Sequence, residues 1–382
     1  MSSSSGSLGG GEKYLAQLGA GLAQLGVQVE TAMSDHPRMD HLEQACSSFG
    51  KVVRIAYRNT YDRMLRCGAA VLARKTIKRT RDFFRAAKTD IIHINKQNIE
   101  DGLDLLLAAK SAGIPTVSTI HIARSMKDLR SRGGFLRDCV ATRVLRGSPA
   151  HFITVAHHCS RQLLASCPGL DAGRVHAVWN GVGSAPSSHR QIVRAEWHYQ
   201  PNDLVLGCVA RLEQQKDPLF ALELLRKLPQ HVKLVWVGDG RLREEFERSM
   251  HQNGLASRVH LEGWRNDARE RLAGFDVFIL PSEYEGFPFA VLEAMAAGLP
   301  CVVSNVDGNS EAVVDGETGF LCRTRDLAQW LARLEVLLGD LGTRQRMGIA
   351  GLDRMRRHFS LEAMARGTAE VYASVLSARG AS

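Results

Sequence analysis

Short apolar runs rich in β-branched residues alternate with helix-length segments along most of the chain. Six runs precede residue 180, namely VQVETAM, KVVRIAY, DIIHIN, PTVSTIH, HFITVA and VHAVW. Six follow it, namely LVLGCVA, VKLVWVG, VHLEGW, FDVFILP, PCVVSN and GFLC. Segments such as EKYLAQLGAGLAQLG and GRLREEFERSMHQNG have the periodicity of amphipathic helices. Strands separated by helix-sized segments predict α/β architecture with doubly wound parallel sheets.

The strands fall into two successive sets, which predict two domains. The 382 residues exceed what one ordinary core accommodates. Gly, Ser and Pro concentrate in NGVGSAPSSHRQ, residues 180–191, where the periodicity disappears. We expect Rossmann-like domains over residues 1–185 and 186–358 that face each other across a cleft, and a helix over 359–382 that returns to the first domain. Ligands of such sheets bind at the carboxyl ends of the strands.

Composition indicates a cytoplasmic protein. The eight cysteines include no Cys-x-x-Cys pair, so neither a disulfide framework nor a zinc knuckle is predicted. No apolar run approaches the roughly 18 residues that a membrane span needs. The first residues, MSSSSGSLGGG, lack the basic start and apolar stretch of a secretory signal.

The positive charge of the chain is concentrated in its first half. Residues 51–150 carry 21 Lys and Arg against 8 Asp and Glu, a net charge of +13. The segment 58–88 mixes ten basic residues with apolar ones. This pattern predicts one or two basic amphipathic helices, which either lie on an anionic membrane surface or present a solvated face. No nucleic-acid-binding motif accompanies the charge, so nucleic acid is not an expected partner.

The segment PSEYEGFPFAVLEAMAAGLP, residues 281–300, carries the most specific chemistry. It follows the apolar run FDVFILP and places Glu285 in the loop at the carboxyl end of that predicted strand. Pro288 and Gly298 predict a helix over about 288–297, with Glu293 on its second turn. The start of a helix attracts a phosphate through its free backbone N–H groups and the positive end of its dipole. Two carboxylates beside it would repel the phosphate, unless their role is to accept hydrogen bonds from hydroxyl groups. Sugars supply such hydroxyls.

This segment resembles the Glu-x7-Glu signature of retaining GT-B glycosyltransferases, most closely glycosyltransferase family 4. Spacing alone would be weak evidence, but the surrounding EGFP and EAMAAGLP strengthen it. GCVARLEQQKDP, VGDGRL, VHLEGWRND and VWNGV match further family blocks in the expected order, so the resemblance covers residues 9 to about 375.

The resemblance assigns the donor site to the second domain. Arg211 and Lys216 would bind the donor diphosphate as a planar fork and a point charge, unless they are ordinary surface cations. Glu285 would hold donor-sugar hydroxyls and Glu293 the ribose. Further donor-binding residues implied by the resemblance are Gly238, Gly240, Trp264, Arg265, Gly286, Phe287 and Pro288.

In the first domain, His121 matches the family's histidine near the reacting sugar. Gly9, Gly10 and Gly11 resemble the family's glycine loop, which lets the backbone approach substrate, before a helix start at Glu12. His121 could instead satisfy a core hydrogen bond, and the glycines could belong to a flexible terminus. The family has a central strand before the glycine loop, yet only the polar MSSSSGSL stands there. Either the chain starts upstream of Met1 or the first sheet closes without that strand.

The implied activity is transfer of a sugar, with retention, from a nucleotide-diphospho-sugar to a glycan or lipid-linked acceptor, in lipopolysaccharide or other cell-envelope polysaccharide synthesis. No Asp-x-Asp pair occurs, so neither a metal nor another cofactor is expected. An anionic inner-membrane surface is a further expected partner, which would place the enzyme peripherally on the cytoplasmic face. The alternatives are a non-catalytic nucleotide-sugar-binding or membrane-associated scaffold, or another GT-B enzyme such as a sugar-nucleotide epimerase or a phosphorylase.

Overall fold

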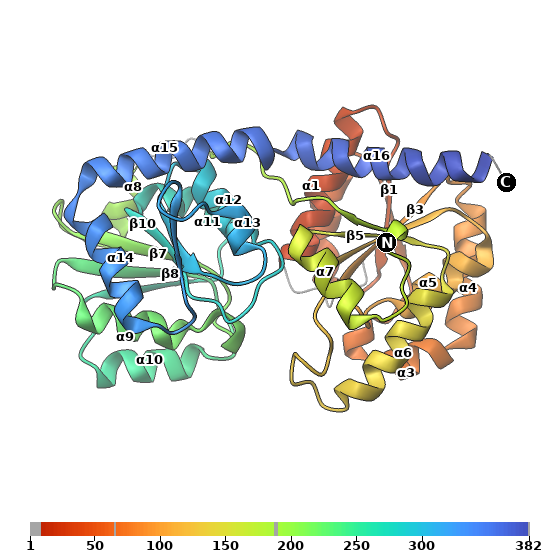
Figure 1. The fold of residues 1–382 in the computed structure, drawn as a ribbon, viewed down its shortest axis with the longest axis horizontal. Helices are drawn as coiled ribbons and strands as arrows, with labels where there is room; N and C mark the ends of the chain where they lie inside the picture. The colour runs from red at the N-terminus through yellow and green to blue at the C-terminus, as the bar shows by residue number, and fades with distance from the viewer. Residues whose placement is uncertain (1–8, 65, 187–189, 381–382) are drawn as a thin grey trace. The chain divides into compact units, whose positions relative to one another are not determined.

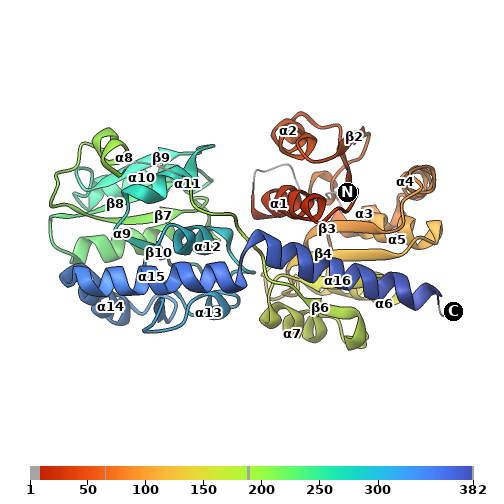
Figure 2. The ribbon, with the colours of Figure 1, turned by 90° about the horizontal axis from the view of Figure 1, so that it is seen from above.

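A computed structural model describes residues 9–64, 66–186 and 190–380 of the chain. Whether a strand precedes the glycine loop concerns residues 1–8, which lie outside the described residues. The structure divides into two compact units, shown in Figures 1 and 2. The first runs to Gly181 and resumes at Leu361, and the second spans Val182–Ser360.

The first unit is a Rossmann-like α/β fold with two parallel sheets among its described residues. Its sheets have the orders β1-β2 and β3-β4-β5-β6. Its strands are β1 (Glu30–Ser34), β2 (Lys51–Ile55), β3 (Ile92–Asn98), β4 (Thr116–Ile122), β5 (His151–Thr154) and β6 (Val175–Ala177). Its α-helices are α1 (Gly10–Gln24), α2 (Asp40–Ser47), α3 (Arg66–Leu72), α4 (Arg74–Ala86), α5 (Leu103–Ala112), α6 (Gly134–Gly147), α7 (His157–Ser166) and α16 (Leu361–Gly380). The 3-10 turns are η1 (Pro37–Met39), η2 (Thr60–Asp62) and η3 (Ala172–Arg174).

The second unit is a Rossmann-like fold around one six-stranded parallel sheet. The strands are β7 (Leu204–Val209), β8 (Val232–Val237), β9 (Val259–Gly263), β10 (Val277–Leu280), β11 (Cys301–Ser304) and β12 (Gly319–Cys322). The α-helices are α8 (Arg190–Glu196), α9 (Pro218–Lys227), α10 (Arg243–Gln252), α11 (Ala268–Arg271), α12 (Phe289–Ala296), α13 (Asn309–Ala312), α14 (Leu327–Gly339) and α15 (Leu341–His358). The 3-10 turns are η4 (Gln214–Lys216) and η5 (Leu272–Gly274).

All twelve predicted strands are present, and the prediction of parallel sheets is confirmed. The central strands of the second unit are nearly continuous apolar runs because helices cover both faces of a parallel sheet. Val277–Leu280 and Cys301–Ser304, for example, are buried at every position. The sequence predicts one or two helices in the basic segment 58–88, and the structure has two, α3 and α4.

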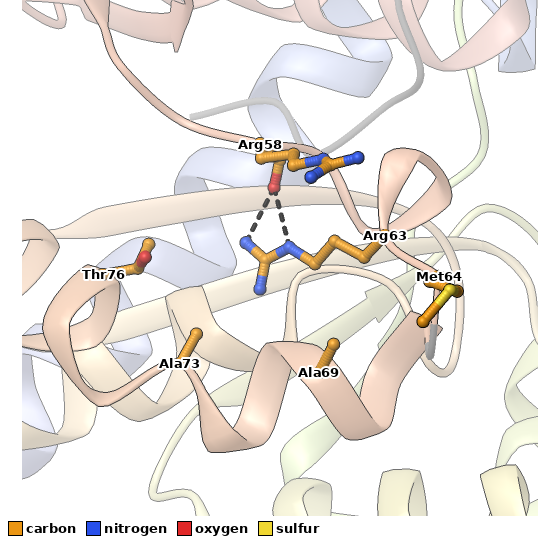
Figure 3. Close-up of a pocket in the computed structure, with 6 residues that line it drawn as sticks. All are labelled: Arg58, Arg63, Met64, Ala69, Ala73 and Thr76. Carbon is orange, nitrogen blue, oxygen red and sulfur yellow. Dashed lines mark hydrogen bonds between the residues drawn. The ribbon is translucent and has the colours of Figure 1, made fainter.

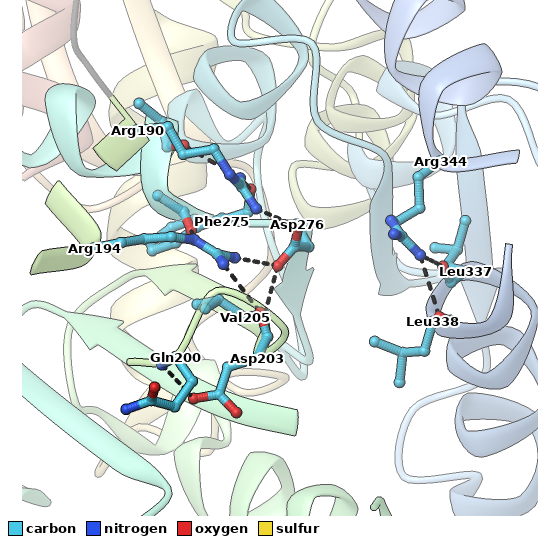
Figure 4. A network of polar contacts seen from close by, with 12 residues as sticks. Arg190, Arg194, Gln200, Asp203, Val205, Phe275, Asp276, Leu337, Leu338 and Arg344 are labelled. Carbon is cyan, nitrogen blue, oxygen red and sulfur yellow. Dashed lines mark hydrogen bonds and ion pairs between the residues drawn. The ribbon is translucent and has the colours of Figure 1, made fainter. Parts of the chain in front are cut away.

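An arginine network ties α8 to the amino-terminal ends of the neighbouring strands β7 and β10 (Figure 4). Both Arg190 and Arg194 bind the Asp276 carboxylate, whose Oδ2 also accepts a hydrogen bond of 2.7 Å from the Val205 backbone N–H. Arg194 further donates to the Asp203 carbonyl at 3.0 Å. This network anchors the start of both strands, at the edge of the sheet opposite to their carboxyl ends.

Helix α16 packs against α1 and completes the core of the first unit. Figure 2 shows it as a long helix beside the strands of this unit. Tyr372 of α16 contacts His93 Nδ1 on β3 at 2.5 Å, and His93 Nε2 lies 2.8 Å from the Thr119 hydroxyl on β4. The Tyr14 hydroxyl on α1 lies 2.9 Å from the same Thr119 hydroxyl. Two helices and two strands thus share one buried polar network.

No helix in the described part of the chain combines the length and the apolar character that crossing a membrane requires.

The half-buried imidazole of His93 predicts a loss of stability in acid. Burial lowers the pKa of His93 from about 6.5 to about 3, so the unfolded chain takes up a proton that the folded chain resists between these values. Stability contributed by neutral His93 is present above pH 6.5 and is lost as the pH falls toward 3. At about pH 5 the loss amounts to about 2 kcal/mol, measurable as a lower urea midpoint.

The control compares His93→Gln with His251→Gln, because His251 is exposed on α10. His93→Gln should flatten the dependence of the urea midpoint on pH between 6.5 and 5, and His251→Gln should leave it unchanged. The same slope in the wild type and in His93→Gln would contradict the assignment.

Candidate donor site

The strand order of the second unit places two loops beside each other at the carboxyl edge of its sheet. The order is β12-β11-β10-β7-β8-β9, so the chain reverses its direction of sheet growth between β7 and β10. Ligands of open α/β sheets bind at such a switch point. The loop after β7 contains Arg211 and Lys216, and the loop after β10 contains Glu285.

One backbone hydrogen bond and one from a side-chain amide hold these two loops together. The Glu283 N–H donates to the Gln215 carbonyl at 2.8 Å, and Gln215 Nε2 donates to the Tyr284 carbonyl at 2.9 Å. The turn η4 is therefore in register with residues 283–285, although the two segments are 69 positions apart. This register sets the distance between the side chains that follow.

Lys216 and Glu285 form an ion pair at the junction of the two loops. Lys216 Nζ lies 2.5 Å from Glu285 Oε1, and their side chains are 14% and 5% exposed. The Ser282 hydroxyl donates to the same Oε1 at 2.6 Å, and the Glu285 N–H donates to Asp307 Oδ2 at 3.0 Å. The sequence pointed to both members of the pair, and the fold brings them into contact.

Glycine at 308 allows the loop after β11 to support the loop of Glu285. A Cβ atom at Gly308 would lie 1.9 Å from the Gly286 carbonyl oxygen, so a larger residue would push the two loops apart. Phe287, next in the loop, is buried and packs edge-on against Phe359 with ring centroids 5.2 Å apart. Gly286 and Phe287 thus shape the loop from within.

The helix predicted over 288–297 is α12, Phe289–Ala296, and Pro288 precedes it as the N-cap residue. Proline fits there because it has no N–H to satisfy. Glu293 lies on the second turn, as predicted, and is buried. Its Oε1 lies 3.4 Å from Arg269 Nε, and Arg269 Nη2 donates to the carbonyls of Gly183 and Ser184 at 2.9 and 2.8 Å.

The turn after β8 runs against the loop after β7. Gly238 has φ of +140°, and a Cβ there would lie 2.0 Å from the Ala210 carbonyl oxygen. A Cβ at Gly240 would lie 2.3 Å from the Leu212 carbonyl oxygen. Both glycines are therefore required by close approach to the segment that carries Arg211. The Arg211 side chain itself is exposed.

Trp264 and Arg265 follow β9 and differ in their surroundings. The Trp264 side chain is 49% exposed. Arg265 is held by two carboxylates, with Nη1 2.9 Å from Glu262 Oε2 and Nε 2.7 Å from Asp267 Oδ1. The hydrogen bond from Arg265 holds the pKa of Asp267 below its ordinary range. The guanidinium of Arg265 therefore organises its own loop.

In the first unit, the predicted helix start at Glu12 was wrong by two residues. Helix α1 begins at Gly10 with Gly9 as its N-cap, because the Glu12 carboxylate accepts a hydrogen bond of 3.1 Å from the Gly9 N–H and so closes the first turn. Gly10 and Gly11 are therefore helical residues and not loop residues. A Cβ at Gly11 would lie 1.9 Å from Gln97 Nε2, so glycine lets β3 approach α1 closely.

His121, near the end of β4, is joined to the start of α1 through Asn95. His121 Nε2 lies 2.8 Å from Asn95 Oδ1, and Asn95 Nδ2 donates to the Gly11 carbonyl at 2.8 Å. Burial lowers the pKa of His121 to about 4, so the ring is neutral near pH 7. Since the amide oxygen only accepts, Nε2 carries the proton and Nδ1 is left as an acceptor.

Sequence reasoning missed the residues that position this site: Ser282, Asp307, Gly308, Arg269 and Asn95. Asp307 and Gly308 follow a buried strand at the carboxyl edge of the sheet, which is a signal that could have found them. Asn95 and Arg269 act through tertiary contacts that no local pattern reports, whereas Ser282 acts locally, three residues before Glu285 in the same loop. In the described residues, no group of three or more His, Cys, Asp or Glu side chains could hold a metal ion.

Two family models match the chain. The model described as "Glycosyltransferase Family 4" matches residues 8–184, and the one described as "Glycosyl transferases group 1" matches residues 203–340. Each match therefore covers most of one structural unit.

Similar proteins include curated enzymes and solved structures. The Escherichia coli UDP-Gal:alpha-D-GlcNAc-diphosphoundecaprenol alpha-1,3-galactosyltransferase is 30% identical over 269 residues, which cover 66% of this chain and 67% of that enzyme. The Rhizobium meliloti lipopolysaccharide core biosynthesis glycosyltransferase LpsE is 29% identical over 53% of this chain and 58% of its own length. The structure of Anabaena HepE in complex with UDP and glucose superposes with a TM-score of 0.82 at 19% identity, covering 98% of both chains. The chain therefore belongs to the group 1 glycosyl transferases of glycosyltransferase family 4 and has the GT-B fold.

Proposed function

We propose that this enzyme transfers a hexosyl group from a nucleotide-diphospho-sugar, with retention of anomeric configuration, to a hydroxyl of a glycan or lipid-linked acceptor in cell-envelope polysaccharide synthesis. The observation that carries the proposal is the Lys216–Glu285 pair at the β7/β10 switch point. The pair places a phosphate-binding cation beside a hydroxyl-binding carboxylate, at the position proposed for the anomeric C–O bond of the donor, which must break. The second unit binds the donor and the first binds the acceptor.

Departure of the nucleoside diphosphate is the step that the loops of the second unit assist. As the anomeric C–O bond breaks, negative charge grows on the leaving phosphate and positive charge on the sugar ring. Lys216 and Arg211 stabilise the phosphate oxygens, with help from the positive end of the α12 dipole behind Pro288. These groups replace a metal ion, so transfer should need none.

Glu285 takes a second role once the diphosphate is bound. In the free enzyme its carboxylate accepts bonds from Lys216 and Ser282. Phosphate oxygens compete for the Lys216 ammonium, and the carboxylate can then accept hydrogen bonds from donor-sugar hydroxyls. Exchange of one partner for another keeps both charges compensated in a site where an unpaired charge would be costly.

A uridine nucleotide is the first donor to test. The similar Escherichia coli enzyme is named for UDP-Gal, and HepE was solved with UDP and with UDP-glucose. Trp264, exposed beside β9, is available to stack on a base, and Arg265 holds the loop that carries it. Glu293 would accept a hydrogen bond from the ribose, with Arg269 fixing the carboxylate.

The acceptor residues of the first unit are His121, Gly10 and Gly11. The chain of hydrogen bonds from His121 through Asn95 to Gly11 joins the end of β4 to the start of α1. A neutral His121 with Nδ1 as acceptor could receive a hydrogen bond from a sugar hydroxyl, which a protonated ring could not. Glycines at the helix start let a substrate approach the backbone closely.

The acceptor is proposed to lie at the cytoplasmic face of an anionic membrane. Arg74, Lys75 and Lys78 are exposed on α4, in the segment where the chain concentrates its positive charge. Basic residues near an anionic surface contribute about 1 kcal/mol each. A lipid-linked acceptor, as in the name of the Escherichia coli relative, would be concentrated at such a surface.

Replacement of the Glu285 carboxylate tests the catalytic assignment. Glu285→Gln keeps the shape of the side chain, but the amide accepts hydrogen bonds from sugar hydroxyls less well and does not neutralise the charge of Lys216. Turnover should therefore fall by on the order of a hundredfold. The assay is release of UDP from UDP-glucose and UDP-galactose in the presence of lipid-linked glycan, with the anomeric configuration of the wild-type product read by NMR. Retention is expected, and an inverted product would contradict the proposed stereochemistry.

The matched control is Glu283→Gln, two residues away in the same loop, which should keep turnover within about twofold. Urea unfolding of each variant shows that the fold is intact. If Glu285→Gln turned over as fast as Glu283→Gln, the carboxylate of Glu285 would have no part in the reaction.

Removal of either proposed phosphate cation should separate binding of the diphosphate from binding of the nucleoside. Arg211→Ala and Lys216→Ala should each weaken UDP affinity by about tenfold or more, since a charge-assisted hydrogen bond is worth about 1.5–3 kcal/mol. Uridine affinity should hardly change. Calorimetric titration measures both ligands.

The control for general charge is Arg241→Ala, because Arg241 is paired with Glu213 and its side chain is 88% exposed. This variant should bind UDP like the wild type. An equal loss of UDP and uridine affinity in Arg211→Ala or Lys216→Ala would place these cations away from the phosphates.

Charge reversal on α4 tests the membrane surface. The triple variant Arg74→Glu, Lys75→Glu, Lys78→Glu should no longer sediment with anionic vesicles, whereas the wild type should do so at low salt and be released at about 0.5 M salt. The control reverses the exposed Arg226, Lys227 and Arg248 of the second unit, with the same change in net charge. A wild type that stays in the supernatant with anionic vesicles would refute membrane attachment.

A further inference from the structure

A hollow in the first unit is lined by none of the proposed donor and acceptor residues. It has a volume of about 340 Å³ and lies between the segment before η2 and the helices α3 and α4. Figure 3 shows its lining, which consists of Arg58, Arg63, Met64, Ala69, Ala73 and Thr76.

Among the residues that the structure describes, one nitrogen of the Arg63 guanidinium has no hydrogen-bond partner. Nε and Nη2 donate to the Arg58 carbonyl at 3.0 and 2.7 Å, and Nη2 also contacts Asp104 Oδ2 at 2.6 Å. Nη1 is buried without a partner, in a side chain only 7% exposed. Figure 3 shows this nitrogen directed toward Ala69 and Ala73. A buried N–H of a charged group without an acceptor is costly, so a water or a ligand should supply one.

The lining favours an anion as that ligand. Arg58 is exposed, and its side chain adds a second guanidinium. None of the six lining residues is acidic. Asp104 is bound on the other side of Arg63 by Nη2 and by the Tyr57 hydroxyl at 2.9 Å, so it holds the guanidinium in place. Two guanidinium groups and the Thr76 hydroxyl suit a phosphate.

The surroundings of the hollow favour a phosphate attached to an apolar chain. The side chains of Met64 and Leu72 are 95% and 74% exposed. Ala69 and Ala73 add apolar surface to the lining of the hollow. Helix α6 packs against α3 and begins with Phe135 and Leu136, which are 73% and 69% exposed. Large apolar side chains exposed beside cations are typical of a surface that meets lipid.

We propose that this hollow binds the phosphate group of an anionic lipid through Arg63 Nη1 and the Arg58 side chain, with the apolar chains of the lipid along Met64 and Leu72. It rests on the proposed membrane attachment for the source of the ligand and is independent of donor binding in the second unit. The site would recognise individual lipid headgroups, which the diffuse charge of α4 alone does not do.

Calorimetric titration of the full chain with a soluble short-chain lipid, dihexanoyl phosphatidate, tests the proposal. One saturable site is expected, with inorganic phosphate and neutral dihexanoylglycerol each binding at least about tenfold more weakly, because each lacks half of the recognised chemistry. Arg58→Ala should weaken phosphatidate binding by about tenfold. Ala73→Leu, which fills the hollow without altering charge, should weaken it similarly.

The matched controls lie at the far end of α4. Arg85→Ala removes one positive charge and Ala86→Leu adds the same bulk at an exposed position, and both should bind phosphatidate like the wild type. Thermal melts verify the fold of each variant, and UDP titration shows separately whether the donor unit is active. Absence of saturable phosphatidate binding would overturn the proposal. So would inorganic phosphate binding as tightly as phosphatidate, or an equal loss in Arg58→Ala and Arg85→Ala.

Discussion

The reversal of strand order between β7 and β10 is the constraint on which the candidate donor site depends. Because the next strands extend the sheet in opposite directions from this point, no crossover helix covers the gap between the two carboxyl ends. The loops after β7 and β10 therefore meet each other, through the bonds from Glu283 and Gln215. The arginine network at the opposite edge anchors the start of the same two strands, so both ends of the switch point are held.

The ion pair of Lys216 and Glu285 is a consequence of this arrangement. Burying two charges is costly, and such a pair is tolerated only where further hydrogen bonds satisfy it. Here Ser282 binds the carboxylate, and the Asp307 side chain binds the backbone of Glu285. Gly308 permits the close approach that puts Asp307 in position. The ion pair and its supporting residues thus come from three separate loops, after β7, β10 and β11.

The two units use their charges differently. In the second unit most described arginines near the site are paired with carboxylates, as Arg241 is with Glu213 and Arg265 with Asp267. In the first unit the cations of α4 face solvent, and the buried Arg63 retains one unpartnered nitrogen. Paired charges hold loops in one geometry, whereas exposed cations act on anything anionic nearby, which is the physical basis of the proposed division between donor chemistry and attachment to a surface.

The sequence by itself determined the elements of this fold and the identity of its main motif. Strand positions follow from apolar runs of the right length, and the second-unit helix around Glu293 follows from Pro288 and Gly298, because these signals act over a few residues. The net positive charge of residues 51–150 also follows directly from the sequence. Even here the local reading misplaced the start of α1, since the Glu12 carboxylate draws Gly10 and Gly11 into the helix.

Only the tertiary structure decided which of these residues meet. Lys216 and Glu285 are 69 positions apart, and His93 and Tyr372 are 279 positions apart. Arg265, expected to contact the donor, also pairs with Glu262 and Asp267. The surroundings of Arg63 depend on how η2 packs on α3 and on its contact with Asp104 of α5. Periodicity and capping specify an element through neighbours along the chain. Partners across the fold are set by strand order and packing, which no local pattern encodes.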